Sequence, residues 1–232
     1  MTRFLIAPIA PIVIACTLFC ATAARADSVA FSGFTNGSKS VDIVLSNPNI
    51  SRALATEAGG FNASLNGGPS FSTYCIDLYE YIGFGSTYTD YTLVTGASHA
   101  FGNPNAATDI GKLFAENNAI GNATAQAAFQ IAIWEIAFET TGAYDLGNGA
   151  AKFSGGSAAS SGALGLASGW LSALSTTTNN SYTVWALDSI GKPGHQDQVF
   201  AAPVPEPSTY ALMAGGLLAM GFFASRRTSR RN

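Results

Sequence analysis

Hydrophobic and polar residues alternate with a period of two over much of the first half of the chain. The alternating runs cover residues 28–34, 40–46, 71–84 and 87–94, and clusters of Gly and Asn separate them. A period of two places one set of side chains on a buried face, while Gly and Asn favour turns and loops. These runs therefore predict β-strands joined by hairpins and loops.

The period becomes helical near Ala106. Apolar residues recur at helical spacing over 107–120 and 123–140, and the second run is apolar on most of its circumference, which is typical of a buried helix. The stretch 147–169 is rich in Gly, Ala and Ser and predicts a flexible loop, followed by a short helix over 164–174 and a strand over 181–188. We expect an α+β fold, with a β-sandwich-like sheet and a helical unit inserted between about 106 and 175.

The first 26 residues have the three parts of a secretory signal peptide. Arg3 supplies the positive charge, an apolar run extends from Phe4 to Cys20, and small residues occupy positions 24 and 26. We therefore expect cleavage before Asp27 and export of the mature chain.

The segment 204–232 combines a Pro-Glu-Pro sequence, about fifteen apolar residues and a cluster of arginines, in that order. The Pro-Glu-Pro sequence consists of Pro205, Glu206 and Pro207, and the arginines are Arg226, Arg227, Arg230 and Arg231. Fifteen residues are short for a stable membrane span, and terminal arginines favour the cytoplasmic side. A plain C-terminal membrane anchor is the alternative to a sorting signal that is removed.

This segment resembles the PEP-CTERM sorting signal of Gram-negative bacteria. The resemblance implies an exosortase as partner, transient anchoring in the inner membrane through a C-terminal hydrophobic sorting helix, and delivery to the cell surface or an exopolysaccharide matrix. From the composition of the chain we expect a domain over 27–188 and a tether over 189–203 before the sorting signal, because the chain becomes polar there and contains Gly and Pro.

Composition and charge narrow the class of partner. The chain is 47% hydrophobic and 11% charged, which favours a packed core over disorder. Between Asp27 and Pro203 there are five basic and thirteen acidic residues, a net charge of −8. Nucleic-acid binding needs a basic surface, so that class of partner is excluded.

Removal of the signal peptide leaves Cys75 as the single cysteine of the mature chain. A lone thiol is unusual in an exported protein, because it can oxidise or couple to other proteins. A small buried apolar side chain is the simplest interpretation. Gln130 is a second unusual residue, since an amide inside an apolar helix needs hydrogen-bond partners, which a neighbouring backbone can supply.

Two short motifs connect these residues. Tyr74-Cys75-Ile76-Asp77 lies on a predicted strand, and Gln130-Ile131-Ala132-Ile133-Trp134 lies on the predicted buried helix. The pair resembles the thioester domains of bacterial surface adhesins. The resemblance implies a bond between Cys75 and Gln130, a shield formed by Tyr74 and Trp134, and covalent attachment to a ligand that carries an amine or a hydroxyl. A structural protein of the exopolysaccharide or biofilm matrix, without a thioester, is the alternative.

Other chemistry finds less support. A cysteine hydrolase would need His99 or His195 as the base, and neither lies in a recognisable motif. Two distant histidines and one cysteine do not form a zinc motif, and Glu135 and Glu139 fit the solvated edge of a helix. We therefore expect no enzyme activity, no cofactor and no metal.

Overall fold

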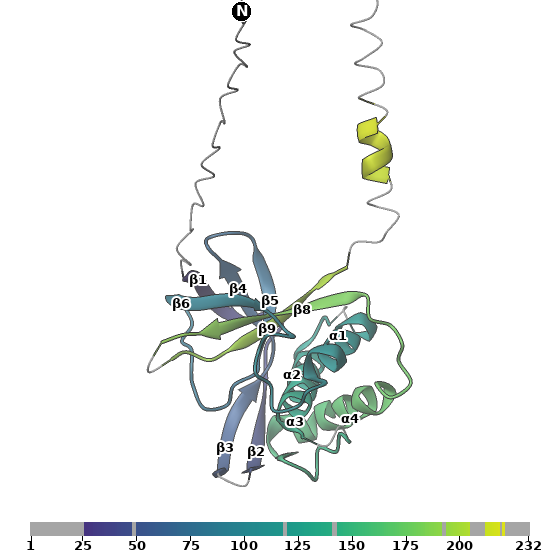
Figure 1. Ribbon diagram of the computed structural model, residues 1–232. Helices are drawn as coiled ribbons and strands as arrows, with labels where there is room; N and C mark the ends of the chain where they lie inside the picture. The colour runs from purple at the N-terminus through teal and green to yellow at the C-terminus, as the bar shows by residue number, and fades with distance from the viewer. Residues whose placement is uncertain are drawn as a thin grey trace, which may run out of the picture.

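The computed structural model describes residues 26–47, 50–117, 120–140, 143–191, 194–204, 212–218 and 220. Figure 1 shows a β-barrel with a group of helices on one side and a β-hairpin that extends beside the helices.

Six antiparallel strands form the barrel, in the order β1-β4-β5-β9-β8-β6. They are β1 (Asp27–Phe34), β4 (Phe61–Leu65), β5 (Ser70–Cys75), β6 (Ser86–Thr95), β8 (Tyr182–Ser189) and β9 (Gln198–Pro203). Alternate residues of these strands fill the interior, where Val29, Phe31, Tyr91 and Leu187 are almost completely buried.

A second, three-stranded sheet has the order β3-β2-β7. It consists of β2 (Lys39–Asn47), β3 (Ile50–Ala58) and β7 (Ala151–Ser154). The β2–β3 hairpin pairs without interruption from Lys39 opposite Ala58 to Asn47 opposite Ile50, and β7 lies on the other edge of β2. This sheet connects the barrel region to the helices.

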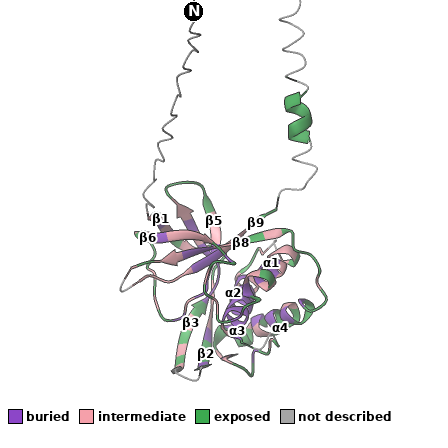
Figure 2. Ribbon diagram, in the orientation of Figure 1, coloured by how far each residue is buried: buried purple, intermediate pink, exposed green. Residues whose placement is uncertain are grey.

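Four helices occupy the chain between β6 and β8: α1 (Ala106–Glu116), α2 (Ala123–Phe138), α3 (Gly156–Ser160) and α4 (Ala163–Ala173). The Asn122 side chain caps α2 by accepting a hydrogen bond from the backbone N–H of Ala125. The helix has no solvent-exposed polar face, and Figure 2 shows it buried along most of its length. The predicted helical insertion is confirmed, with α2 as its central element.

The main sheet differs from the predicted sandwich-like arrangement, because the strands close into a barrel. Alternation along a strand indicates which face is buried, but it does not indicate which strands become neighbours. Four strands also lie where we expected none. β3 and β4 lie between the predicted strands 40–46 and 71–84, β7 lies within the Gly-rich stretch, and β9 occupies the second half of the predicted tether.

The sequence did not predict β9, because the first residue of this strand is a glutamine. Gln198 is fully buried, and its Oε1 accepts a hydrogen bond from the Thr73 hydroxyl at 3.3 Å. Its Nε2 lies 3.2 Å from Oε1 of Gln196. These partners offset the loss of water around the amide, so a polar residue can lie within the barrel.

Residues 212–218 and 220 after the barrel are helical and exposed. The rest of the predicted sorting helix lies outside the described residues, as does the predicted signal peptide apart from residue 26. Among the helices that the structure describes, none is long and apolar enough to cross a membrane.

Candidate functional site

The structure brings Cys75 and Gln130 into direct contact. Cys75 is the last residue of β5, Gln130 lies in the middle of α2, and both residues are fully buried. The backbone N–H of Cys75 donates to Oε1 of Gln130 at 2.9 Å, and Nε2 of Gln130 donates to the backbone carbonyl of Cys75 at 2.7 Å. The two sequence motifs therefore meet across 55 positions of the chain.

The end of β4 explains why a side-chain amide lies there. β4 pairs with β5 only as far as Phe61, opposite Thr73. The backbone N–H of Ile76 donates to the carbonyl of Asp197, on the side of β9. Because successive residues of a strand direct their backbone groups to opposite sides, the N–H and carbonyl of Cys75 point toward the side of β4. β4 does not extend to this position, and the Gln130 side chain forms hydrogen bonds with both backbone groups of Cys75 in its place.

Three polar or amphipathic residues follow one face of α2 at a spacing of four: Gln126, Gln130 and Trp134. Oε1 of Gln126 accepts hydrogen bonds from the Tyr74 hydroxyl at 2.9 Å and from the Gly60 backbone N–H at 3.2 Å. A side chain at Gly60 would collide with this oxygen and with the Tyr74 ring. The glycine thus allows the chain to approach α2 closely, and Gln126 fixes Tyr74 beside the cysteine.

The Cys75 thiol is held in its neutral form. Burial raises its pKa far above the usual range, the Trp134 N–H acts in the opposite direction, and the Asp77 carboxylate raises the pKa further. The sulfur also donates a hydrogen bond to the backbone carbonyl of Asp77 at 2.6 Å. Because a nucleophilic cysteine needs an adjacent cation to become a thiolate, this environment does not suit a hydrolase.

Trp134 covers the site from α2. It is only 2% exposed, and its ring stacks on Phe153 of β7 with centroids 6.4 Å apart and an interplanar angle of 4°. Its indole N–H is buried and makes no hydrogen bond of ordinary geometry, although it lies close enough to Cys75 to lower the pKa of the thiol. The predicted shield at Trp134 therefore also places a polar group beside the sulfur.

Both histidines are engaged with aspartates. Nδ1 of His99 lies 2.7 Å from Asp188, and Nδ1 of His195 lies 2.7 Å from Asp90. Neither histidine is a partner of Cys75 among the hydrogen bonds of the described residues. His195 lies in the predicted tether, and its backbone N–H donates a hydrogen bond to the Ser189 hydroxyl at 2.8 Å, which fixes this part of the segment.

Metal-ligating atoms of His99, Asp188 and Asp197 lie within 4.8 Å of one another. Such a set could in principle hold a divalent cation. Burial, together with the nearby Asp188 carboxylate, raises the pKa of Asp197 to about 6. The His99–Asp188 hydrogen bond accounts for two of the three groups, and we assign no metal to them.

Glu135 and Glu139 are buried, contrary to the predicted solvated edge. Their carboxylates accept backbone N–H groups of the loop that follows α2, from Asp145 at 2.7 Å and Ala150 at 3.1 Å. Burial raises the pKa of Glu135 to about 7. Their spacing suggested an exposed stripe, and only the position of the loop shows that they hold its backbone.

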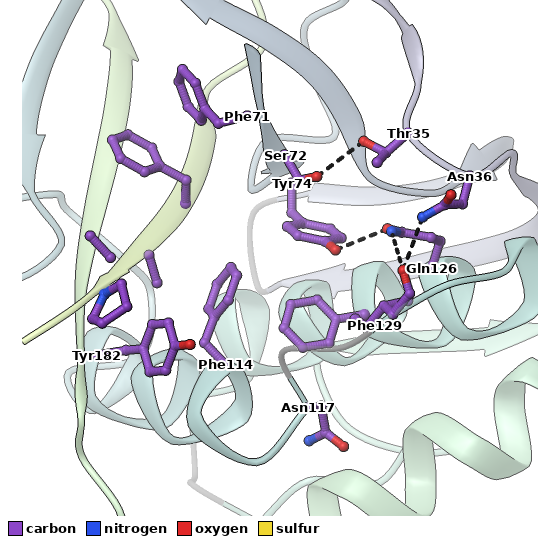
Figure 3. A pocket seen from close by; sticks show the side chains of 15 residues that line it. Thr35, Asn36, Phe71, Ser72, Tyr74, Phe114, Asn117, Gln126, Phe129 and Tyr182 are labelled. Carbon is purple, nitrogen blue, oxygen red and sulfur yellow. Dashed lines mark hydrogen bonds between the residues drawn. The ribbon is translucent and has the colours of Figure 1, made fainter. Parts of the chain in front are cut away.

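A pocket of about 450 Å³ lies on the other side of Tyr74, between the barrel and the helices (Figure 3). Tyr74, Gln126 and Phe129 belong to its lining, so residues adjacent to Cys75 and Gln130 in sequence face the pocket while Cys75 and Gln130 themselves do not. The sequence contained no signal for this pocket, because its walls come from six separate parts of the chain.

Comparison with known proteins identifies the C-terminal segment. Residues 203–227 match the PEP-CTERM protein-sorting motif, which confirms the predicted sorting signal. The chain is therefore an exported protein that an exosortase sorts to the cell surface or extracellular space. Pro205, Glu206, Pro207 and the four arginines lie outside the described residues, so the structure adds nothing to their predicted roles.

The folded domain has a distant structural neighbour. It is similar to the N-terminal domain of the Streptococcus pyogenes pilus tip adhesin Cpa, with 15% sequence identity and a TM-score of 0.48. The similarity covers 80% of this chain and 97% of the adhesin domain. No curated protein matches the chain in sequence.

Proposed function

We propose that the exported domain attaches covalently to a ligand through a thioester between Cys75 and Gln130. The observation that carries this proposal is the paired contact between the Gln130 carboxamide and the backbone of Cys75, in a fully buried site. The ligand would carry an amine or a hydroxyl. The protein would act once per molecule and would not be an enzyme.

Bond formation needs only the two side chains. The Cys75 sulfur attacks the side-chain carbonyl carbon of Gln130, the thiol proton passes to Nε2, and ammonia leaves. The tetrahedral intermediate carries negative charge on Oε1, the atom that already accepts the Cys75 N–H at 2.9 Å. A fixed donor at this position stabilises the developing charge, as in an oxyanion hole.

Ligand attack reverses the roles of the two residues. An amine or hydroxyl adds to the Gln130 carbonyl carbon, the Cys75 sulfur departs, and the proton of the ligand passes to the sulfur. A thiol of high pKa is a poor leaving group, so the environment that raises the pKa of Cys75 also protects the bond from premature attack. The buried Trp134 N–H is suitably placed to assist the departing sulfur.

Sorting and attachment fit together in this proposal. The PEP-CTERM motif accounts for export and processing, and the thioester would then fix the sorted protein to a surface or matrix component. Once the domain has folded, burial would protect the thioester, since both residues are inaccessible to water.

The intact mass of the purified mature protein tests the bond. Under mild, amine-free conditions the wild type should lack one ammonia relative to its sequence, and Cys75→Ala and Gln130→Ala should both have the full mass. Asn–Gly sequences can also lose ammonia, and the chain contains three, at Asn36, Asn66 and Asn148. A loss that persists in Cys75→Ala would therefore come from one of these asparagines, and it would leave the matrix protein without a thioester as the better interpretation.

A further inference from the structure

The barrel is closed between β5 and β9 by only a short stretch of pairing. β5 pairs with β9 only at Tyr74 opposite Val199 and at Cys75 opposite Gln198. Beyond these pairs, β5 continues beside β4, and β9 continues beside β8 as far as Pro203. The two strands separate there, and the 450 Å³ pocket lies where they diverge.

Six aromatic rings line this pocket. Tyr74 and Phe129 are buried at its base, and the half-buried rings belong to Phe71, Phe114, Tyr182 and Phe200. Figure 3 shows the rings of Phe114 and Phe129 on the helical side, the ring of Tyr182 beside Phe114, and Phe71 on the side of the barrel. The half-buried rings present apolar surface to a bound ligand.

None of the fifteen lining residues carries a formal charge. A charged ligand would lose its hydration here without gaining an ion pair, which is unfavourable in a partly enclosed site. The acidic character of the domain, with its net charge of −8 between residues 27 and 203, further disfavours anions.

Amides and hydroxyls lie among the rings. Nδ2 of Asn36 donates to the backbone carbonyl of Ile120 at 2.9 Å, and Nδ2 of Asn117 donates to that of Leu113 at 3.1 Å. These bonds orient the two amides and leave their carbonyl oxygens to accept from a ligand. The Thr35 and Ser72 hydroxyls, 3.2 Å apart, add groups that can donate or accept.

We propose that this pocket is a binding site for a neutral oligosaccharide. Sugar rings present apolar C–H faces that suit aromatic side chains, and hydroxyls that suit amides and serine or threonine. A purely apolar ligand would leave the carbonyl oxygens of the two amides without a donor. An added peptide strand does not fit between β5 and β9, because the Phe71 and Phe200 rings meet there with centroids 4.8 Å apart.

This site is separate from the proposed thioester, and it needs no covalent bond. Cys75→Ala should therefore bind sugar as the wild type does, and pocket variants should retain the ammonia loss. These variants distinguish failure of the sugar-binding proposal from failure of the thioester proposal.

Isothermal titration of the exported protein with cellohexaose, maltohexaose and chitohexaose tests the site, with hexagalacturonate as the charged comparison and a neutral hexapeptide as the comparison for a protein partner. We expect at least one neutral hexasaccharide to bind more tightly than both comparisons. Ala202→Phe should abolish binding by filling the pocket without removing core packing, since Ala202 is a half-buried lining residue.

Tyr182→Ala should weaken binding roughly three- to tenfold, as expected for the loss of one aromatic contact. Phe84→Ala is the matched control, because Phe84 is 46% exposed and lies outside the pocket. No binding of any neutral hexasaccharide at millimolar concentration would overturn the proposal. So would equal binding of the galacturonate, tighter binding of the peptide, or unchanged binding by Ala202→Phe.

Discussion

Cleavage of the proposed thioester by methylamine should lower the thermal stability of the domain. The bond would join residues 55 positions apart, and methylamine would open this covalent loop. The carbonyl oxygen of Gln130 is present in both the thioester and the methylamide, so it can accept the Cys75 N–H in both forms. The main difference between the two forms is therefore the covalent link.

The magnitude follows from loop entropy. A cross-link that closes a loop of 55 residues lowers the entropy of the unfolded chain by an amount worth about 4 kcal/mol at room temperature. For a domain of this size, that free energy corresponds to a melting temperature lower by roughly 8–16 °C.

Differential scanning calorimetry before and after methylamine treatment measures the shift, and mass spectrometry verifies that one amine has been added. Cys75→Ala treated in the same way is the control and should show no change. A wild type that gains methylamine with its melting temperature unchanged would refute the loop-entropy argument. A wild type that gains no methylamine, even when partly unfolded, would refute the bond.

Three further predictions test other parts of the interpretation. Trp134→Phe keeps most of the stacking on Phe153 and loses the indole N–H. The thioester should therefore still form, but its reaction with methylamine, measured by thiol titration, should slow about tenfold. An unchanged rate would mean that Trp134 only shields the bond. Glu135 has a folded-state pKa of about 7, above its unfolded value, so its protonated form favours the fold and its contribution is lost as the pH rises from about 4 to above 7. Urea unfolding of Glu135→Gln should therefore vary less between pH 5 and pH 8 than the wild type, and an identical dependence would contradict this. Replacement of Pro205, Glu206 and Pro207 by alanine should leave the unprocessed chain in the membrane fraction, as judged by immunoblotting; surface material of normal size would contradict the role of the motif.

The contact between Cys75 and Gln130 could be predicted because two local signals, each weak alone, pointed to the same pair of residues. A strand pattern and a fully apolar helix each contained one residue that did not fit, and the family resemblance linked the two. The reason why Gln130 fits there depends on where β4 ends, and no local pattern in the sequence specifies that end.

Other features depended on tertiary contacts. Gln198 made β9 look like part of a polar linker, because its burial depends on the hydroxyl of Thr73, which is 125 positions away. Glu135 and Glu139 showed the spacing of an exposed helix edge, but the loop after α2 covers them. The pocket arises from the divergence of β5 and β9, which is a property of the sheet and not of either strand alone.

The position of β9 has a consequence for the order of events during export. A chain that emerges from its N-terminus delivers β9 after every other strand of the barrel, and the sorting motif begins at the last residue of β9. The barrel can close only once residues 198–203 are outside, when the sorting segment is the next part to follow. Completion of the fold and recognition by the exosortase are thus separated by a few residues of chain, and a fragment that ends at residue 188 would lack the strand that joins β5 to β8.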